Sequence, residues 1–235
     1  MFIHPVSGAL LSFALVTVSA SAAEESIDSC GTEITKPGRY HISKDLTCAS
    51  GPYAIDIEAS NVELHFDGHT LTGGGIGTTG SGVTVGISSG ISHVNIVGNG
   101  TVTGFGGGGI VVGGINSFIF NVRVSGMAAR NNRVGITLYQ AIDSALTSNV
   151  ASNNITTGIE LVALSLSDVL DANQTDGNGA YGIEIKSGST DSLFQANEAH
   201  GNLVLDFFES ATWPPACLNT WKSNQFRAAS PSCIQ

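Results

Sequence analysis

Apolar and polar positions alternate in short segments along most of the chain, and the same kind of segment recurs many times. Each copy begins with a small residue, as in Gly158-Ile159-Glu160-Leu161 and Gly182-Ile183-Glu184-Ile185. An alternation with a period of two places one set of side chains on each face of a β-strand. Further copies begin at Ala54, Gly82, Gly109, Gly135 and Asn202. The pattern therefore predicts repeated short strands.

The spacing of the copies indicates a solenoid. Successive copies begin 28, 27, 26, 23, 24 and 20 residues apart, by subtraction of their positions. Propeller blades need about 40 residues, and a leucine-rich repeat needs an L-x-x-L-x-L frame that is absent here. One turn of a parallel β-helix fits this length. We expect an all-β, single-domain β-helix of about seven coils. Its buried aliphatic column would be Ile55, Val83, Ile110, Ile136, Ile159, Ile183 and Leu203.

Asparagines recur at the turns between strands, where the backbone polar groups of a stacked coil are cut off from water. Such groups need hydrogen-bond partners, and a side-chain amide can supply them from a neighbouring coil. The sequence predicts a ladder of turn residues with a structural role, whereas Asn178 is assigned to a surface loop. The predicted ladder is Asp67, Asn99, Asn121, Asn149, Asn173, Asn197 and Asn224.

Composition and charge narrow the class of protein. The 235 residues include 30 glycines and only 12% charged residues, which argues against a helical bundle, while 42% hydrophobic residues argue against disorder. The net charge is −10, with nine lysines and arginines. Nucleic acid is therefore not expected as a partner, because no basic surface is available to neutralise phosphates.

The N-terminus has the pattern of a secretory signal peptide. An apolar run from Leu10 to Val18 is followed by Ala20-Ser21-Ala22-Ala23, an A-x-A type ending. We expect a signal peptide over 1–23, an N-terminal cap over 24–53, coils over 54–212, and a C-terminal coil and cap over 213–235. The mature protein would be secreted or periplasmic, monomeric, and without a membrane segment.

Four cysteines fit an exported protein, and four cysteines allow three pairings. The local pairings are favoured because each closes a short loop, namely Cys30 with Cys48 and Cys217 with Cys233. Metal binding by these thiols is the alternative, and the absence of a C-x-x-C spacing argues against it.

The repeats, the asparagine ladder and the segment from Ser60-Asn61-Val62-Glu63-Leu64 to Asp67-Gly68-His69 resemble the pectate-lyase-like superfamily of secreted right-handed parallel β-helices. That superfamily includes lyases, hydrolases, epimerases and non-catalytic binders. The resemblance implies a groove on the outward face of the first strand of each coil. It also implies that loops before those strands form the groove walls, here Gly73–Ser81, Gly104–Gly108 and Ser125–Val134.

Two glutamates are candidates for chemistry on that face. Alternation points Glu160 and Glu184 outward, in one column with Thr137 and about 5 Å apart. Two carboxylates so close suit general acid–base work or a calcium site. The alternative is a solvated charged face, in which Lys186 forms an ion pair with Glu184 or Asp206. The second outward column is expected to be Tyr139, Val162, Lys186 and Asp206.

The segment Tyr181-Gly182-Ile183-Glu184 is similar to part of the catalytic strand of mannuronan epimerases. Glu184 matches the acidic position of that pattern, while Ile185 and Lys186 replace the proline and histidine that follow it. Arg130 and Arg133, assigned to the loop before the next strand, could neutralise a uronate carboxylate. Arg123 belongs to a second strand and is expected to be remote.

The sequence therefore predicts a secreted protein that acts on an acidic, uronate-containing polysaccharide by lyase or epimerase chemistry. Arg130 or Arg133 would neutralise the carboxylate, and Lys186 or Tyr139 would transfer the proton. Calcium is a possible cofactor at the two glutamates, and Asp206 would bind substrate. A non-catalytic glycan-binding or structural β-helix is the alternative, and an enzyme acting on a small molecule is a third.

Overall fold

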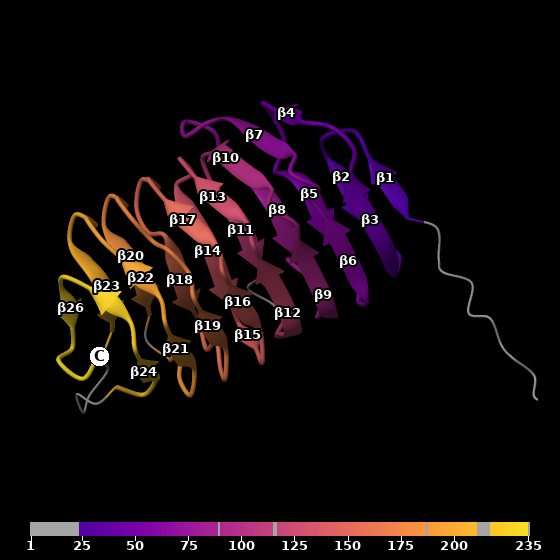
Figure 1. Ribbon diagram of the computed structural model, residues 1–235. Helices are drawn as coiled ribbons and strands as arrows, with labels where there is room; N and C mark the ends of the chain where they lie inside the picture. The colour runs from indigo at the N-terminus through magenta and orange to yellow at the C-terminus, as the bar shows by residue number, and fades with distance from the viewer. Residues whose placement is uncertain (1–23, 89, 115–116, 187, 211–216, 235) are drawn as a thin grey trace, which may run out of the picture.

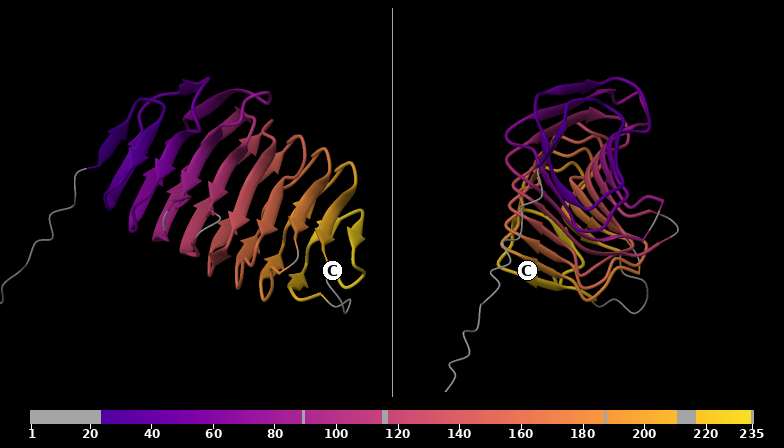
Figure 2. Two further views of the ribbon diagram at one scale, coloured as in Figure 1. Left: turned by 180° about the vertical axis from the view of Figure 1, so that it is seen from behind. Right: turned by 90° about the vertical axis from the view of Figure 1, so that its right-hand side faces the viewer.

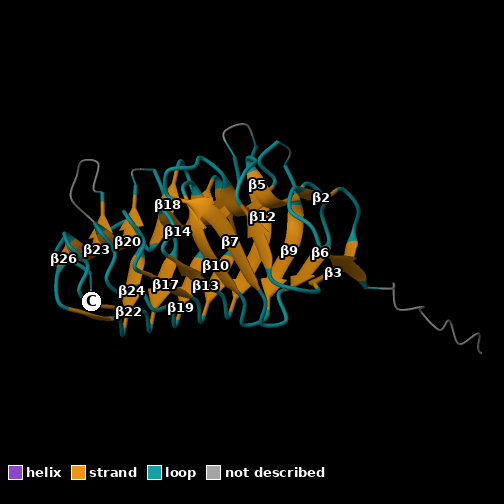
Figure 3. Cartoon of the chain, turned by 90° about the horizontal axis from the view of Figure 1, so that it is seen from above, coloured by secondary structure: helices purple, strands orange, loops and turns teal. Residues whose placement is uncertain are grey.

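The chain folds into a solenoid built only from strands and turns (Figure 3). The computed structural model describes residues 24–234, apart from 89, 115–116, 187 and 211–216. Across those residues all 26 regular elements are strands, so no apolar helix long enough to cross a membrane is present there. The all-β prediction is confirmed. The expected signal peptide and the expected boundary between coils and C-terminal cap at 212/213 lie outside the described residues.

Three sheets of parallel strands form the walls of the solenoid within the described residues. The ten-stranded sheet contains β1 (Glu25–Ile27), β3 (Gly38–Ile42), β6 (Val62–His65), β9 (Ser92–Val97), β12 (Ile119–Ser125), β15 (Ala141–Ile142), β16 (Ala145–Thr147), β19 (Val169–Asp171), β21 (Leu193–Gln195) and β24 (Thr220–Lys222). The nine-stranded sheet contains β2 (Thr32–Ile34), β5 (Tyr53–Ile57), β8 (Ser81–Val85), β11 (Gly108–Val112), β14 (Val134–Tyr139), β18 (Ile159–Val162), β20 (Tyr181–Ile185), β23 (Leu205–Glu209) and β26 (Ala229–Ser230).

The third wall is narrower. The five-stranded sheet contains β4 (Leu46–Cys48), β7 (Thr70–Gly75), β10 (Thr101–Phe105), β13 (Ala128–Arg130) and β17 (Val150–Ser152). A two-stranded sheet of β22 (Glu198–Ala199) and β25 (Gln225–Phe226) follows, and bridges through Gln174 join β17 to β22.

Each coil runs from the nine-stranded sheet to the ten-stranded sheet and then to the third wall. Successive coils stack as rungs from the N-terminal to the C-terminal end (Figure 1), and the end-on view shows one coil behind another (Figure 2). The described residues form about eight turns, against seven predicted. The difference arises because the segment expected as an N-terminal cap already contributes β2, β3 and β4, which pair with β5, β6 and β7.

The core is a column of apolar side chains that point into the solenoid. On the nine-stranded sheet Ile55, Val83, Ile110, Ile136, Ile159 and Ile183 lie in register and are fully buried, as predicted. The last predicted member is wrong. Phe207 pairs with Ile183 and is buried, whereas Leu203 is 79% exposed.

The predicted asparagine ladder forms in the later coils. Asn173 Oδ1 accepts from the backbone N–H of Asn149 at 3.0 Å, and its Nδ2 donates to the Leu146 carbonyl at 2.9 Å. Asn149, Asn197 and Asn224 repeat this arrangement. Asp67, Asn99 and Asn121 do not join the ladder. Asp67 and Asn99 are turn residues and Asn121 lies within β12. All three have positive φ, a conformation that asparagine and aspartate adopt more readily than most residues.

A second asparagine ladder lies before the strands of the nine-stranded sheet, and the sequence analysis did not predict it. Its members are Asn132, Asn154, Asn178 and Asn202. Asn178 is therefore a buried ladder residue, contrary to the prediction of a surface loop. This ladder also explains the small residue that starts each repeat. A Cβ on Gly158 would lie 2.8 Å from Asn178 Nδ2 and 2.7 Å from the Gly182 carbonyl oxygen.

A third row of buried polar side chains links the coils just before the strands β16, β19 and β21 of the ten-stranded sheet. Asp168 Oδ1 accepts from the Ser144 N–H at 2.8 Å, and the Asp168 N–H donates to Ser192 Oγ at 3.0 Å. Asp168 is fully buried, and its Oδ2 atom has no hydrogen-bond partner among the described residues. Burial raises the pKa of Asp168 to about 8 even though the bond from Ser144 opposes the shift.

Disulfides Cys30–Cys48 and Cys217–Cys233 are present, as predicted, and no described cysteine is free. Each closes a loop near one end of the solenoid. Closing such a short loop stabilises a protein by about 3 kcal/mol. We expect reduction to lower the melting temperature measured by circular dichroism, and thiol titration before reduction to find no free cysteine. An unchanged melting temperature after complete reduction would contradict a stabilising role for both disulfides.

Candidate functional site

The candidate site is a row of outward-facing side chains on the nine-stranded sheet. Thr137 pairs in register with Glu160, and Glu160 pairs with Glu184, which confirms the predicted column. In-register residues on adjacent parallel strands lie about 4.8 Å apart. The full row along the sheet is Glu33, Asp56, Thr84, Val111, Thr137, Glu160, Glu184, Phe208 and Ser230.

Lys186 lies between the two glutamates. Its Nζ atom is 2.7 Å from Glu160 Oε2 and 3.8 Å from Glu184 Oε2. Both carboxylate side chains are 13% exposed, whereas that of Lys186 is 42% exposed. The ammonium group therefore balances part of the repulsion between two carboxylates that are largely shielded from solvent.

Two threonine hydroxyls hold the carboxylates in place. Thr137 donates to Glu160 Oε1 at 3.0 Å, and Thr157, in the turn before β18, donates to Glu184 Oε2 at 3.0 Å. Burial acts to lower the pKa of Lys186, but the hydrogen bond to Glu160 and the charges of both glutamates outweigh it and raise that pKa. Lys186 is therefore an ammonium ion at neutral pH. It suits binding a carboxylate more than removing a proton.

The second outward row contains Tyr139, Val162 and Lys186, as predicted. Tyr139 pairs with Val162, and the Lys186 N–H bonds to the Leu161 carbonyl. The predicted outward position of Asp206 is wrong. Asp206 is 3% exposed and pairs with the N–H groups of Arg227 and Ala228 and with Asn202. Asp206 accepts from the amide of Asn202 and so ends the second ladder. The prediction failed because the turn residue Asn202 was assigned to the position that starts a strand.

An aromatic pair extends the site beyond Glu184. Phe208 pairs in register with Glu184, and its ring stacks on that of Tyr181 with centroids 5.0 Å apart and planes 16° apart. Both side chains are partly exposed. The pair was not predicted, because Leu203 was expected at the buried position that Phe207, four residues later, occupies on β23. The constant offset of 24 residues from Ile159 to Ile183 to Phe207 was the signal that could have placed it.

The same row contains another shielded carboxylate, Asp56, nearer the N-terminal end of the sheet. Asp56 is 3% exposed, and Thr84 Oγ1 donates to its Oδ1 atom at 2.6 Å. Burial raises the pKa of Asp56 to about 6, with smaller contributions from Glu58 and Glu33 and an opposing one from Thr84. Four strand spacings, about 19 Å, separate Asp56 from Glu160 along the row.

The two candidate arginines lie in different surroundings. Arg130 is the last residue of β13 in the five-stranded sheet and not part of a loop. The segment Ser125–Val134, predicted to be a loop that forms a groove wall, therefore contains a strand. Only residues 131–133 connect β13 to β14. Arg133 is in this connection and is exposed. Its backbone carbonyl accepts from Thr156, in the turn that precedes β18. Arg123 lies on β12 of the ten-stranded sheet, as predicted.

The donor set at Glu160 and Glu184 is a poor match for calcium. Calcium takes six to eight oxygen ligands, and here an ammonium group already bonds to one carboxylate and lies near the other. No group of three or more histidine, cysteine, aspartate or glutamate side chains suited to a metal ion occurs among the described residues. Calcium binding by these two glutamates remains a prediction, and it would require Lys186 to move away.

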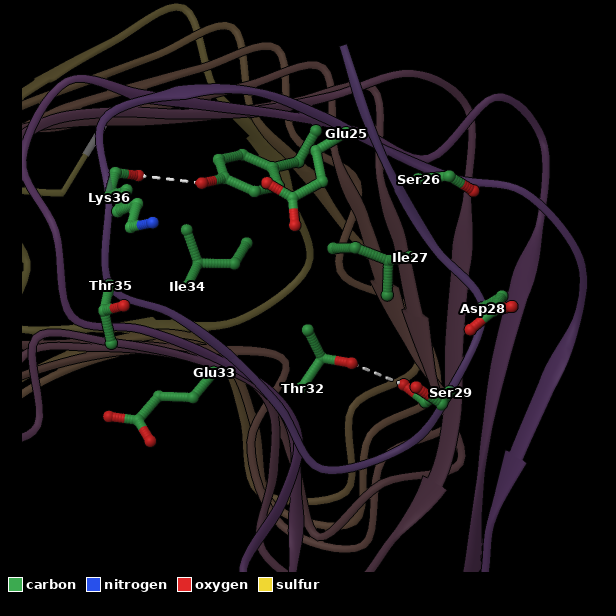
Figure 4. A pocket seen from close by; sticks show the side chains of 11 residues that line it. Glu25, Ser26, Ile27, Asp28, Ser29, Thr32, Glu33, Ile34, Thr35 and Lys36 are labelled. Atoms are coloured by element: carbon green, nitrogen blue, oxygen red, sulfur yellow. Dashed lines mark hydrogen bonds between the residues drawn. The ribbon is translucent and has the colours of Figure 1, made fainter.

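A separate hollow of about 350 Å³ lies at the N-terminal end of the solenoid, formed by β1, β2 and the residues around them (Figure 4). Ile27 and Ile34 lie at its base, and Glu25, Asp28 and Glu33 line it. It marks the end of the stack, where no coil precedes the first among the described residues. Five strand spacings along the nine-stranded sheet separate β2 from β18, so this hollow is distinct from the site at Glu160.

A parallel solenoid of three-strand coils with side-chain ladders at its turns defines the class of this protein. The chain matches the family described as right-handed β-helix region over residues 38–199 and belongs to it. No curated protein matches the chain.

Solved structures with a similar fold exist at low sequence identity. The A-module of mannuronan C-5 epimerase AlgE6 from Azotobacter vinelandii is 14% identical with a TM-score of 0.58, and the match covers 88% of this chain and 66% of that one. The C387A mutant of DFA-IIIase from Arthrobacter chlorophenolicus A6, in complex with DFA-III, is 15% identical with a TM-score of 0.47. That match covers 88% of this chain and 58% of the other. The chain thus spans less than two thirds of either structure.

Proposed function

We propose that this protein is an extracellular enzyme that acts on an acidic, uronate-containing polysaccharide by lyase or epimerase chemistry. The proposed site is the outward face of β14, β18, β20 and β23. The observation that carries the proposal is the Lys186 ammonium held between Glu160 and Glu184, next to the stacked Tyr181 and Phe208 rings. An ammonium group with a raised pKa beside partly exposed aromatic rings is typical of a binding site.

Both reactions begin by removal of the proton beside the uronate carboxylate, and the anion that results must be stabilised. Lys186 is the group for that stabilisation, because it stays protonated and its side chain is 42% exposed. Arg133, exposed before β14, is the second candidate cation. We assign proton removal to the Glu184 carboxylate, whose contact with Lys186 is the longer one, and donation of a proton to the substrate to the Tyr139 hydroxyl.

The fold neighbour supports the substrate class. A mannuronan C-5 epimerase is among the structures with this fold, and mannuronan is an acidic polysaccharide. Two disulfides fit an oxidising compartment outside the cytoplasm, as does the predicted signal peptide. A polysaccharide outside the cell is therefore the proposed partner.

The site is tested by Glu184→Gln and Lys186→Ala. In an active site each change should lower turnover of a uronate polymer by at least tenfold, about 1.4 kcal/mol of transition-state stabilisation, while circular dichroism shows that each variant is folded. Ultraviolet absorbance of new unsaturated ends measures lyase activity, and proton NMR of the sugar composition measures epimerisation. Both assays are run with added calcium and with a chelator.

Glu198→Gln provides the matched control, because it removes the same charge from a glutamate on β22, outside the nine-stranded sheet. Full activity in Glu184→Gln and Lys186→Ala would reject the site. In a purely structural charged face, Glu184→Gln relieves repulsion and Lys186→Ala leaves two largely shielded carboxylates without their cation, so stability changes in opposite directions with no loss of function.

A non-catalytic glycan-binding protein is the second candidate function. The specific observation in its favour is that Lys186 already pairs with Glu160, which leaves a charge-balanced surface beside an aromatic pair. Binding of a uronate polymer that Tyr181→Ala and Phe208→Ala weaken, with no product by either assay, would select this function over catalysis.

A further inference from the structure

The outward face of the ten-stranded sheet has a groove that the proposed function does not use. Two hollows of about 370 and 310 Å³ lie on it and share Glu63 and Asn95 in their linings, so they are continuous. The first also contains Arg123 and Ser125, and the second contains Arg39. This groove, called here the β6–β12 groove, spans β3, β6, β9 and β12.

The β6–β12 groove offers a cation without a partner among the described residues. Arg39, Glu63, Asn95 and Arg123 lie in one row across the four strands. Arg39 Nε is 3.4 Å from Glu63 Oε2, and His65 Nε2 is 2.8 Å from Glu63 Oε1, so the charge of Glu63 is balanced locally. The Arg123 side chain forms no ion pair or hydrogen bond with any described residue, and the same holds for the side chain of Asn95.

Arg123 and Asn95 are neighbours in register on β12 and β9. Arginine donates paired N–H groups in a fork that matches a carboxylate, and the asparagine amide can donate to a sugar hydroxyl or accept from one. A guanidinium and an amide side by side, both open to a ligand, thus fit an anion that also carries hydroxyl groups.

Two exposed aromatic side chains lie at the start of β12, Phe120 on the strand and Phe118 just before it. Phe118 and Phe120 are 39% and 42% exposed, and they flank the buried Ile119, so both point outward. Phe120 pairs with Ser92, and Arg123 follows it on β12 with Asn121 as a positive-φ residue between them. Neither ring lines the two hollows, so these aromatic faces offer apolar contact area beside the groove and not within it.

We propose that the β6–β12 groove binds an acidic saccharide, with Arg123 pairing with its carboxylate. The ligand class rests on the proposed function, since the uronate polymer proposed as substrate of the nine-stranded sheet would here also bind to the ten-stranded sheet. The groove would hold the polymer while the nine-stranded sheet acts on it. Of the nine lysines and arginines in a chain with net charge −10, two line this groove, so a long polyphosphate is a weaker match.

The experiment measures binding of a short uronate oligosaccharide, and of a neutral oligosaccharide of equal length, to the full chain by isothermal titration calorimetry and by chemical-shift perturbation. The variants are Arg123→Gln and, as matched control, Lys222→Gln, which removes one positive charge from β24 of the same sheet. Glu184→Gln with Lys186→Ala tests the other face in parallel. Circular dichroism melts confirm that each variant is folded.

The expected result is two sites per chain for the uronate oligosaccharide and none for the neutral one. Arg123→Gln should remove one site, with at least a tenfold loss of affinity there, and leave turnover of a short substrate unchanged. Lys222→Gln should remove neither. A single site that Arg123→Gln leaves intact would overturn the groove and keep the proposed function. A single site that Arg123→Gln abolishes would support the groove and count against the site at Glu184. No binding at all would overturn both.

Discussion

Replacing Asp168 with asparagine is expected to stabilise the protein above neutral pH by several kcal/mol. The pKa of Asp168 rises from 3.8 to about 8 on folding, so the folded chain holds a proton there that the unfolded chain has released. Stability from this group is therefore lost as the pH rises from about 4 to about 8. A shift of four pKa units corresponds to roughly 5 kcal/mol, at about 1.4 kcal/mol per unit. An asparagine side chain cannot ionise, so this loss disappears in the variant.

Chemical denaturation at pH 4.5 and at pH 9 measures the effect. The stability difference between Asp168→Asn and the native chain should grow between those two pH values. Asp191→Asn is the control, because Asp191 is exposed in a turn and its side chain bonds only to the adjacent Thr190 among the described residues. A pH dependence that is the same in Asp168→Asn and the native chain would show that Asp168 does not ionise in this range. Asp143, whose charge raises the same pKa, must remain unchanged in both proteins.

Replacing Asn173 with alanine should destabilise the protein by roughly 2–6 kcal/mol. The side chain satisfies the Asn149 N–H and the Leu146 carbonyl, and each of these buried groups costs about 1–3 kcal/mol when it is left unpaired. Asn173 also connects the ladder to the next coil, since its own N–H and Nδ2 both donate to Asn197 Oδ1. Urea denaturation of the variant and the native chain gives the difference.

Asn95→Ala is the matched control for this substitution. Asn95 lies on β9, is partly exposed, and has no side-chain hydrogen bond to any described residue, so its loss should cost less than about 0.5 kcal/mol. Equal effects at Asn95 and Asn173 would reject the ladder as a source of stability.

The fold and most of the candidate site could be predicted because neighbouring coils repeat nearly the same length. A spacing of 23 or 24 residues carries Thr137 onto Glu160 and Glu160 onto Glu184, so simple alternation gives the correct outward row. Lys186 follows two residues later and points to the same side. The ion pair with Glu160 is a consequence of that placement. Of the two partners predicted for Lys186, Glu184 is confirmed at 3.8 Å and Asp206 is wrong, while the shorter contact, at 2.7 Å, is with Glu160 of the preceding coil.

The errors occur where one type of residue can occupy two positions. Asn202 is followed by apolar residues, as a strand start would be, but it occupies the position of Asn178 one coil earlier. Asp206 then replaces the glycine expected at the start of β23, and Phe207 and Phe208 replace aliphatic and polar residues. An asparagine joins a ladder only where its amide is buried, and the alternation of apolar and polar residues does not show which asparagines are buried. The Tyr181–Phe208 pair and the second ladder were missed for this reason.

The constant coil length gives this surface a particular evolutionary freedom. Glu160 and Glu184 occupy equivalent positions in successive 24-residue units, each with the same inward isoleucine and the same ladder asparagine. An in-frame duplication of one unit repeats the asparagine ladder bonds between coils and places a further carboxylate in the same row. A single genetic event can therefore lengthen the acidic surface without the protein having to evolve a new fold around it.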